Sequence, residues 1–205
     1  MTWKEALSDK RYKLEAVLTL VVLTIALLSL TNFLNFIETR QGIILADPIL
    51  RHFGPINLTW LIFGLIYICL IVAIINLAKY PLQLMLILQT YSLLVIVRMA
   101  AMYLMPLNPP PDMISLNDPF VQYFGTGRLL TKDLFFSGHT ATIFLLFLFA
   151  RNKILKYVFL SCTIAVGISV LLQHVHYSID VLAAPFFAYS CFCIILYMHK
   201  TGISE

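Results

Sequence analysis

Long apolar runs separated by short polar segments dominate the chain. A helix that spans a membrane needs about 20 residues that are predominantly apolar. Six runs meet this need, at residues 14–34, 59–78, 81–104, 134–150, 154–173 and 178–198. The pattern predicts an all-α membrane protein, a six-transmembrane-helix bundle that forms a single domain over residues 1–205.

Two polar segments are too broken to form spans. Residues 38–57 contain Asp47-Pro48 and Gly54-Pro55, which indicate interfacial turns. Residues 106–132 form the longest connection and hold five of the nine prolines. A long loop in a compact protein is usually functional or disordered, and a stiff proline run favours an ordered lid.

Composition narrows the class of protein. Hydrophobic residues make up 60% of the chain, charged residues 12%, and the mean hydropathy is +0.90. This balance excludes a second soluble domain, a nucleic-acid binder, a disordered chain and a secreted disulfide scaffold. The first apolar run is longer than the core of a signal peptide, so we expect an uncleaved first span.

The basic residues predict the orientation of the bundle. With six spans, nine of the 14 Lys and Arg residues fall on the side of the two termini, and five fall on the other side. Positive charge favours the cytoplasm, so we expect both termini to be cytoplasmic.

Ionisable residues within apolar spans are costly and usually functional. Four of them, Arg98, His139, His176 and Asp180, fall near span ends that the predicted topology places on the non-cytoplasmic face. Arg98 could be a snorkelling interfacial residue. Its depth before the span end favours a phosphate or carboxylate partner instead.

The tetrapeptide Ser137-Gly138-His139-Thr140 opens a predicted helix. Helix N-termini offer unpaired backbone N–H groups to a phosphate, and a glycine lets the backbone approach closely. The alternative is an ordinary N-cap serine followed by an interfacial histidine.

His176 and Asp180 stand four residues apart, which places them on one face of a helix. The carboxylate can hold one imidazole nitrogen and leave the other to attack or to accept a proton. Two alternatives stay open at this point. The pair could close a tight turn, or His174, His176 and Asp180 could bind zinc or iron.

Together these motifs resemble the type-2 phosphatidic acid phosphatase superfamily, and more closely its sphingomyelin synthase and sphingolipid synthase branch. Residues 133–140 are similar to the branch's Gly-Asp-x3-Ser-Gly-His-Thr motif, and residues 174–181 to its His-x-His-Tyr-Thr-x-Asp-Val motif. Residues 98–107 resemble the Arg-containing third-span motif. Residues 47–50 resemble the Asp-Pro stretch between the first two spans.

The resemblance implies catalytic roles. His176 would be the nucleophile, Asp180 would orient it, and His139 would act as general acid and base. Arg98, Ser137 and Gly138 would bind the phosphate, while Asp133, Tyr103, His174 and Tyr177 would support the pocket. No metal and no cofactor are implied.

The chain also departs from the family's pattern. Thr131-Lys132 replaces the Cys-Gly pair before the motif aspartate, and Val170 stands where some relatives have an arginine. Phosphate binding would therefore depend on other donors, chiefly Arg98.

The implied activity is transfer of a phosphate-bearing head group from a membrane phospholipid to ceramide or another lipid hydroxyl, such as that of diacylglycerol. Two alternatives stay open: a phospholipase C or lipid phosphatase that uses water, and a non-catalytic lipid-binding protein on the same fold. We expect a multi-pass protein of a bacterial cytoplasmic membrane, or otherwise of a Golgi- or ER-type membrane, with the site on the non-cytoplasmic face. A homo-oligomer is left open.

Overall fold

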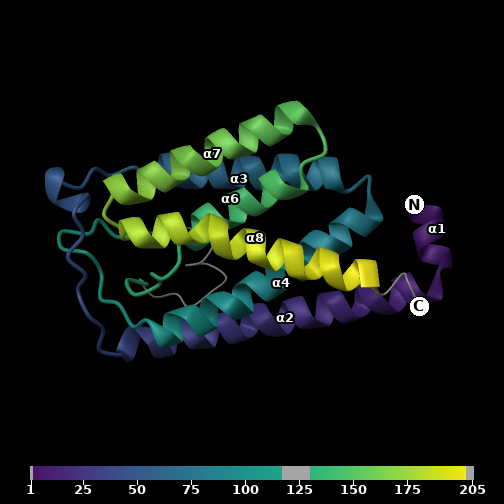
Figure 1. The fold of residues 1–205 in the computed structure, drawn as a ribbon, viewed down its shortest axis with the longest axis horizontal. Helices are drawn as coiled ribbons and strands as arrows, with labels where there is room; N and C mark the ends of the chain where they lie inside the picture. The colour runs from purple at the N-terminus through teal and green to yellow at the C-terminus, as the bar shows by residue number, and fades with distance from the viewer. Residues whose placement is uncertain (1, 117–129, 202–205) are drawn as a thin grey trace.

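The computed structural model describes residues 2–116 and 130–201. Within these residues it is all-helical: α1 (Trp3–Ser8), α2 (Lys10–Thr39), the short 3-10 helix η1 (Leu50–His52), α3 (Thr59–Leu77), α4 (Pro81–Leu104), α6 (Gly138–Phe149), α7 (Lys153–Leu172) and α8 (Ser178–Thr201). The long helices lie roughly along one axis, and α1 and the end of α8 lie at the same end of the bundle (Figure 1).

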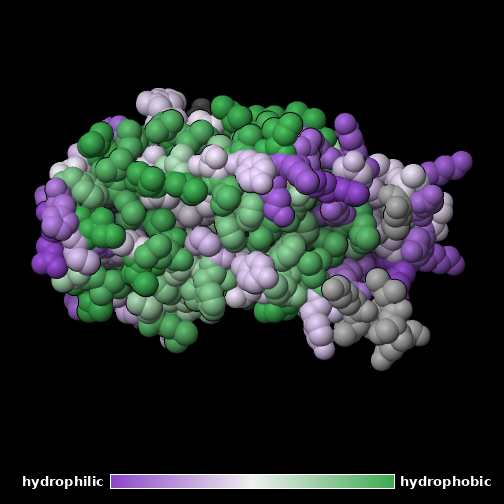
Figure 2. Space-filling model, turned by 45° about the horizontal axis from the view of Figure 1, so that its top comes forward, coloured by the Kyte–Doolittle hydropathy of each residue, from purple (hydrophilic) through white to green (hydrophobic). Residues whose placement is uncertain are grey.

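Five of these helices, α2, α3, α4, α7 and α8, are long and apolar enough to cross a membrane. Figure 2 shows the same property on the surface, where hydrophobic side chains form a broad middle region and hydrophilic ones gather toward both ends. The prediction of an α-helical multi-pass membrane protein is therefore confirmed. The five helices begin and end close to the predicted boundaries, except that α2 extends several residues beyond the expected run at both ends.

The span expected over residues 134–150 is the exception. The structure has only the 12-residue helix α6 there. Such a helix is about 18 Å long, whereas the hydrocarbon core of a bilayer is about 30 Å thick. The residues before Gly138 are not helical, because the side chain of Ser137 accepts a hydrogen bond from the Thr140 N–H and caps the helix at that point. Six full-length spans are thus not what the described residues form.

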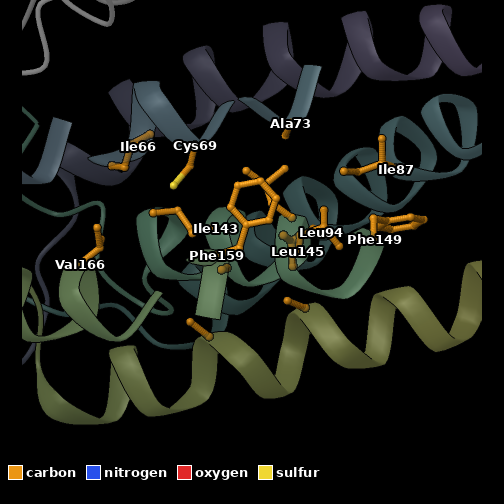
Figure 3. Close-up of a cluster of buried hydrophobic side chains, with 14 of the residues drawn as sticks. Ile66, Cys69, Ala73, Ile87, Leu94, Ile143, Leu145, Phe149, Phe159 and Val166 are labelled. Atoms are coloured by element: carbon orange, nitrogen blue, oxygen red, sulfur yellow. The ribbon is translucent and has the colours of Figure 1, made fainter. Parts of the chain in front are cut away.

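Helix α6 lies inside the bundle and contacts α3, α4, α7 and α8. Its apolar side chains Ile143, Leu145 and Phe149 meet residues of α3, α4 and α7 in the main hydrophobic core (Figure 3). Ala141 and Ile143 are completely buried. A helix enclosed in this way is positioned by packing, so its N-terminus has a fixed place within the bundle.

The short length of α6 sets the depth of that N-terminus. Helix α7, its antiparallel neighbour, has 20 residues, eight more than α6. At about 1.5 Å per residue, α6 therefore begins about 12 Å short of the far end of α7. This end of the bundle is covered by the segment between α2 and α3 and by the segment that follows α4, which are joined by a parallel bridge between Ile43 and Leu107.

The expected turns in residues 38–57 are present, since the segment after Thr39 is non-helical apart from η1. Part of the expected lid, residues 117–129, lies outside the described residues. The part that is described is held in place: the Ile114 N–H donates to the carbonyl of Gln173 at 3.2 Å. The side chain of Gln173 also accepts from the Leu58 N–H and donates to Thr59 and Ile114, so it joins three segments at this end.

Candidate active site

Two histidines predicted to act together do lie together. His139 stands in the first turn of α6, and His176 lies in the turn between α7 and α8. Their ring centroids are 6.3 Å apart with the planes inclined at 64°. His139 also meets the ring of Phe63 from α3 edge-on, at 6.1 Å. The fold therefore brings two imidazoles from distant parts of the sequence together at the start of α6.

His176 and Asp180 form the expected pair, but they do not lie on one face of a helix, because His176 belongs to the turn before α8 and Asp180 to the first turn of α8. The His176 Nδ1 lies 3.4 Å from the Asp180 Oδ2, and both side chains are almost completely buried. This distance exceeds that of a charge-assisted hydrogen bond, about 2.7–2.9 Å. The same Asp180 oxygen accepts the Tyr177 N–H at 3.0 Å. Because Nδ1 faces the carboxylate, Nε2 is the ring nitrogen that can attack a substrate.

Arg98 is buried on α4, with 7% of its surface exposed. Its Nε donates to the Phe136 carbonyl at 2.9 Å, and its Nη2 lies 2.7 Å from the Asp133 Oδ1. The first contact is a hydrogen bond and the second an ion pair, so two of the three guanidinium nitrogens are held in place. Arg98 is thus a fixed residue of the site rather than a snorkelling anchor.

The contact with Arg98 shifts the pKa of the Asp133 carboxyl. Burial raises the pKa of the Asp133 carboxyl, but the Arg98 guanidinium beside it, together with His176 and His139, lowers that pKa by more, so the net shift is downward. The carboxylate therefore stays ionised at neutral pH and pairs with the guanidinium.

Gly138 explains how Arg98 reaches the start of α6. A Cβ at this position would lie 2.8 Å from the Arg98 Cζ and 3.0 Å from its Nε. Only a glycine leaves room for the guanidinium to lie against the backbone here. The glycine of the predicted motif is therefore in direct contact with the predicted phosphate-binding arginine.

Ser137, a predicted phosphate-binding residue, makes structural hydrogen bonds with its backbone and its side chain. Its backbone N–H donates to the Asp180 carbonyl at 3.0 Å, and its side chain caps α6. The bond to Asp180 connects the start of α6, which carries His139, to the first turn of α8, which follows His176. Because the Ser137 N–H donates to Asp180 in this way, it is not available as a donor to a phosphate.

His174 is near the two catalytic candidates in sequence but faces elsewhere. Its Nδ1 lies 3.2 Å from the Pro111 carbonyl, and its ring meets Phe53 edge-on at 5.5 Å. Its φ of 55° turns the chain between it and His176. Within the described residues no three His, Cys, Asp or Glu side chains form a group that could hold a metal ion. The alternative that used His174 as a metal ligand therefore gains no support.

Tyr177 and Tyr103 also differ from each other in placement. Tyr177 is buried beneath the covering segments, where its hydroxyl donates to the Asn108 carbonyl at 2.9 Å and accepts the Leu45 N–H at 3.3 Å. Tyr103 is 54% exposed and lies beside the Arg40 guanidinium, 4.8 Å from its ring centroid. The structure does not bring Tyr103 to the histidines, because it lies on the outer face of the last turn of α4.

Two supporting carboxylates were not predicted as site residues. Asp47 accepts hydrogen bonds from the N–H of Ser178 at 2.6 Å and from its hydroxyl at 3.0 Å, and so caps α8 from another segment. Glu38, at the end of α2, accepts the N–H groups of Thr131 and Lys132 and holds the non-helical segment that leads to Asp133. The Asp47-Pro48 turn was a signal for a loop, but nothing in the sequence indicated its partner.

Comparison with known families agrees with this geometry. A family model described as PAP2 superfamily C-terminal matches residues 132–199, about one third of the chain. The match begins one residue before Asp133 and includes His139, His176 and Asp180. No curated protein matches the chain. The family match supports the type-2 phosphatidic acid phosphatase superfamily, and with it a membrane enzyme of the lipid phosphatase or phosphotransferase type.

Proposed function

We propose that this protein transfers a phosphate-bearing head group from a membrane glycerophospholipid to ceramide or another lipid hydroxyl, through a covalent intermediate on His176. The observation that carries the proposal is the convergence of His139, His176 and Arg98 at the start of α6, with Asp180 directly behind His176.

In the first step, the His176 Nε2 attacks phosphorus and the bond from phosphorus to the glycerol oxygen breaks. His139, in its protonated form, gives its proton to the departing diacylglycerol alkoxide. The imidazole of His176 becomes positively charged as the P–N bond forms, and the Asp180 carboxylate stabilises that charge. Arg98 and the backbone at Gly138 bind the non-bridging phosphoryl oxygens.

In the second step, neutral His139 removes the proton from the hydroxyl of the acceptor lipid. The resulting oxygen attacks phosphorus, the P–N bond breaks, and His176 regains its neutral form. If water takes the place of the acceptor lipid, the same residues give a phospholipase C or lipid phosphatase reaction. The resemblance to the sphingolipid synthase branch favours a lipid acceptor.

The proposed location follows from the distribution of basic residues, which puts the histidine end on the non-cytoplasmic face. The proposed membrane is a bacterial cytoplasmic membrane, or otherwise one of the Golgi or ER type. The second candidate function is lipid binding without catalysis. The buried pairing of His176 with Asp180 favours an enzyme, because passive binding requires no such pair.

The test is to incubate the purified protein with a phospholipid labelled in its head group, with and without ceramide in the same vesicles. Transfer predicts label on ceramide and none in the His176→Ala variant. Label released to water at the same rate with and without ceramide would show that the protein is a hydrolase rather than a transferase. Equal turnover in wild type and His176→Ala would contradict both.

A further inference from the structure

Residues of α2, α4 and α8 line a groove. It lies toward the end of the bundle where α2 begins and α8 ends, and Figure 1 shows these two helix ends close together. Its volume is about 640 Å³, within the range of roughly 300–1,000 Å³ that is typical of small-molecule sites. Neither histidine of the candidate active site lines it, and nor does Arg98 or Asp180. It is therefore a second cavity, which the proposed reaction does not use.

The length of the groove matches one half of a bilayer. Along α4 its lining residues run from Leu82 to Ile96, and along α2 from Asp9 to Val22. At about 1.5 Å per residue these stretches measure about 20 Å. One leaflet contributes about 15 Å of hydrocarbon and about 5–8 Å of head-group region. The groove thus extends from the level of the head groups to about the middle of the membrane.

The polarity of the groove changes along its length. The charged lining residues, Asp9, Arg11 and Glu15, all belong to the start of α2. Further along, the lining carries no Asp, Glu, Lys or Arg and is mostly aliphatic, with Leu18 and Leu93 among its members, apart from a few polar residues such as Gln89. An amphiphile fits this arrangement in one direction only, with its head group at the start of α2 and an acyl chain along the aliphatic part.

A row of hydrogen bonds joins the three helices within the groove. The Gln89 Nε2 donates to the Thr19 hydroxyl at 3.0 Å, and the Gln89 Oε1 lies 2.7 Å from the His199 Nε2. A carbonyl oxygen only accepts, so the His199 Nε2 is the donor. Since the groove walls are linked in this way, their spacing does not depend on a ligand to hold them apart.

The charges at the head-group end have a specific order. Arg11 pairs with Glu15 at 3.2 Å, one turn away, and the Asp9 carboxylate accepts the Arg11 backbone N–H and caps α2. Two carboxylates and one guanidinium at this end of the groove attract a head group that carries both signs of charge. A phosphate can contact Arg11 while a neighbouring ammonium donates to the carboxylates. A head group with a trimethylated amine fits less well, because it has no N–H to donate to the carboxylates. An anionic head group without an amine also fits less well, because the two carboxylates repel it.

From these observations we infer that the groove binds one phospholipid whose zwitterionic head group carries a primary amine. The lipid comes from the leaflet opposite the histidine site, and it acts as a bound ligand of the bundle rather than as a substrate. This inference does not rest on the proposed function, because no atom of the groove takes part in the reaction.

The test is native mass spectrometry of the purified full chain, titrated with phosphatidylethanolamine, phosphatidylcholine and phosphatidylglycerol that share the same acyl chains. We expect one phosphatidylethanolamine to bind about tenfold more tightly than either of the others, as one added charge-assisted hydrogen bond would give. Leu93→Trp fills the groove and should remove this preferred binding. Ile164→Trp makes the same kind of change on the exposed face of α7 and should leave it intact.

A second variant keeps the test decisive if Leu93→Trp fails to fold. Glu15→Gln changes a partly exposed residue, and it should bring phosphatidylethanolamine and phosphatidylcholine to nearly equal affinity. Equal affinity of the wild type for all three lipids would overturn the inference, since it would show only general contact with the bilayer. Undiminished preference in a folded Leu93→Trp variant would place the lipid elsewhere, including the histidine site, and would overturn it too.

Discussion

The two ends of the bundle differ in whether they bury polar side chains. The histidine end has exposed residues such as Arg51 and His52, but it also holds an inward group: Arg98, Ser137, His176 and Asp180 are all buried and contact one another or the backbone. At the other end the charges of Lys10, Lys153 and their neighbours are exposed. Burial of charge is costly unless it is paired, so the inward group marks the site of chemistry. The outward group is typical of a membrane surface.

The largest effect should come from His176. Replacing it with alanine removes the attacking nitrogen, and we expect phosphoryl transfer to fall by at least about 10³-fold with loss of covalent phospho-enzyme. Asp180→Ala should also abolish labelling. His139→Ala should keep labelling with a nitrophenyl phosphodiester, whose leaving group needs no proton, and lose transfer to a lipid hydroxyl.

His52→Ala is the matched control for these variants, since His52 is exposed in η1 at the same end of the bundle. It should retain full transfer. Labelling trapped on His139 of the wild type would reverse the assignment of nucleophile and general acid.

The next largest effect should come from Arg98. Arg98→Ala should lower turnover about 10²–10³-fold, because the phosphoryl oxygens lose their main charged donor. Arg98→Lys should recover only part of it, since a point charge replaces a two-pronged donor. Arg151→Ala, at the opposite end of the bundle, removes the same side chain from a surface contact with Tyr80. Its steady-state kinetics should match those of the wild type. A loss of turnover in Arg151→Ala as large as that in Arg98→Ala would show that the two ends do not differ in this way.

Much of this contrast could be predicted from the sequence. Hydropathy alone located the five long helices, because each is a nearly continuous apolar run. The spacing of His176 and Asp180 also identified the pair. The expectation that both lie on one helix face was wrong, because α8 begins only at Ser178 and His176 lies in the turn before it.

The rest depends on contacts between distant segments. Asp47 caps α8 across 131 residues of sequence, and Glu38 holds Thr131 across 93; no local pattern encodes such partners. The short length of α6 was missed because Leu134 and Phe135 continue its apolar run. In the structure they precede the capping residue Ser137, and Leu134 belongs to a separate small cluster with Leu107 and Tyr177.

A smaller effect should come from Gly138. In Gly138→Ala the new Cβ would lie 2.8 Å from the Arg98 Cζ, so the guanidinium must shift, and we expect turnover to fall about 10-fold to 10²-fold. Gly64→Ala is the control, because a Cβ there meets nothing within 4 Å. If the loss acts through Arg98, a double-mutant cycle with Arg98→Ala should be strongly non-additive. Additive losses would show that Gly138 acts independently of the arginine.

The smallest effect should be on stability rather than chemistry, and it concerns Asp47. Burial raises the pKa of the Asp47 carboxyl, but its hydrogen bonds from Ser178, Ile49 and Leu50 lower that pKa by more. A carboxyl whose pKa is lowered by folding stabilises the protein above its unfolded value of about 3.9, and that contribution is lost as the pH falls through the folded pKa. Asp47→Asn should therefore lower the free energy of unfolding by about 1–2 kcal/mol at pH 7. The difference from wild type should shrink as the pH falls below about 4. Thermal unfolding in detergent across this pH range measures it, with Asp112→Asn as the control, because Asp112 is exposed and its φ of 58° suits asparagine. A deficit that stays constant down to the lowest pH would show that the charge of Asp47 has no part in holding α8.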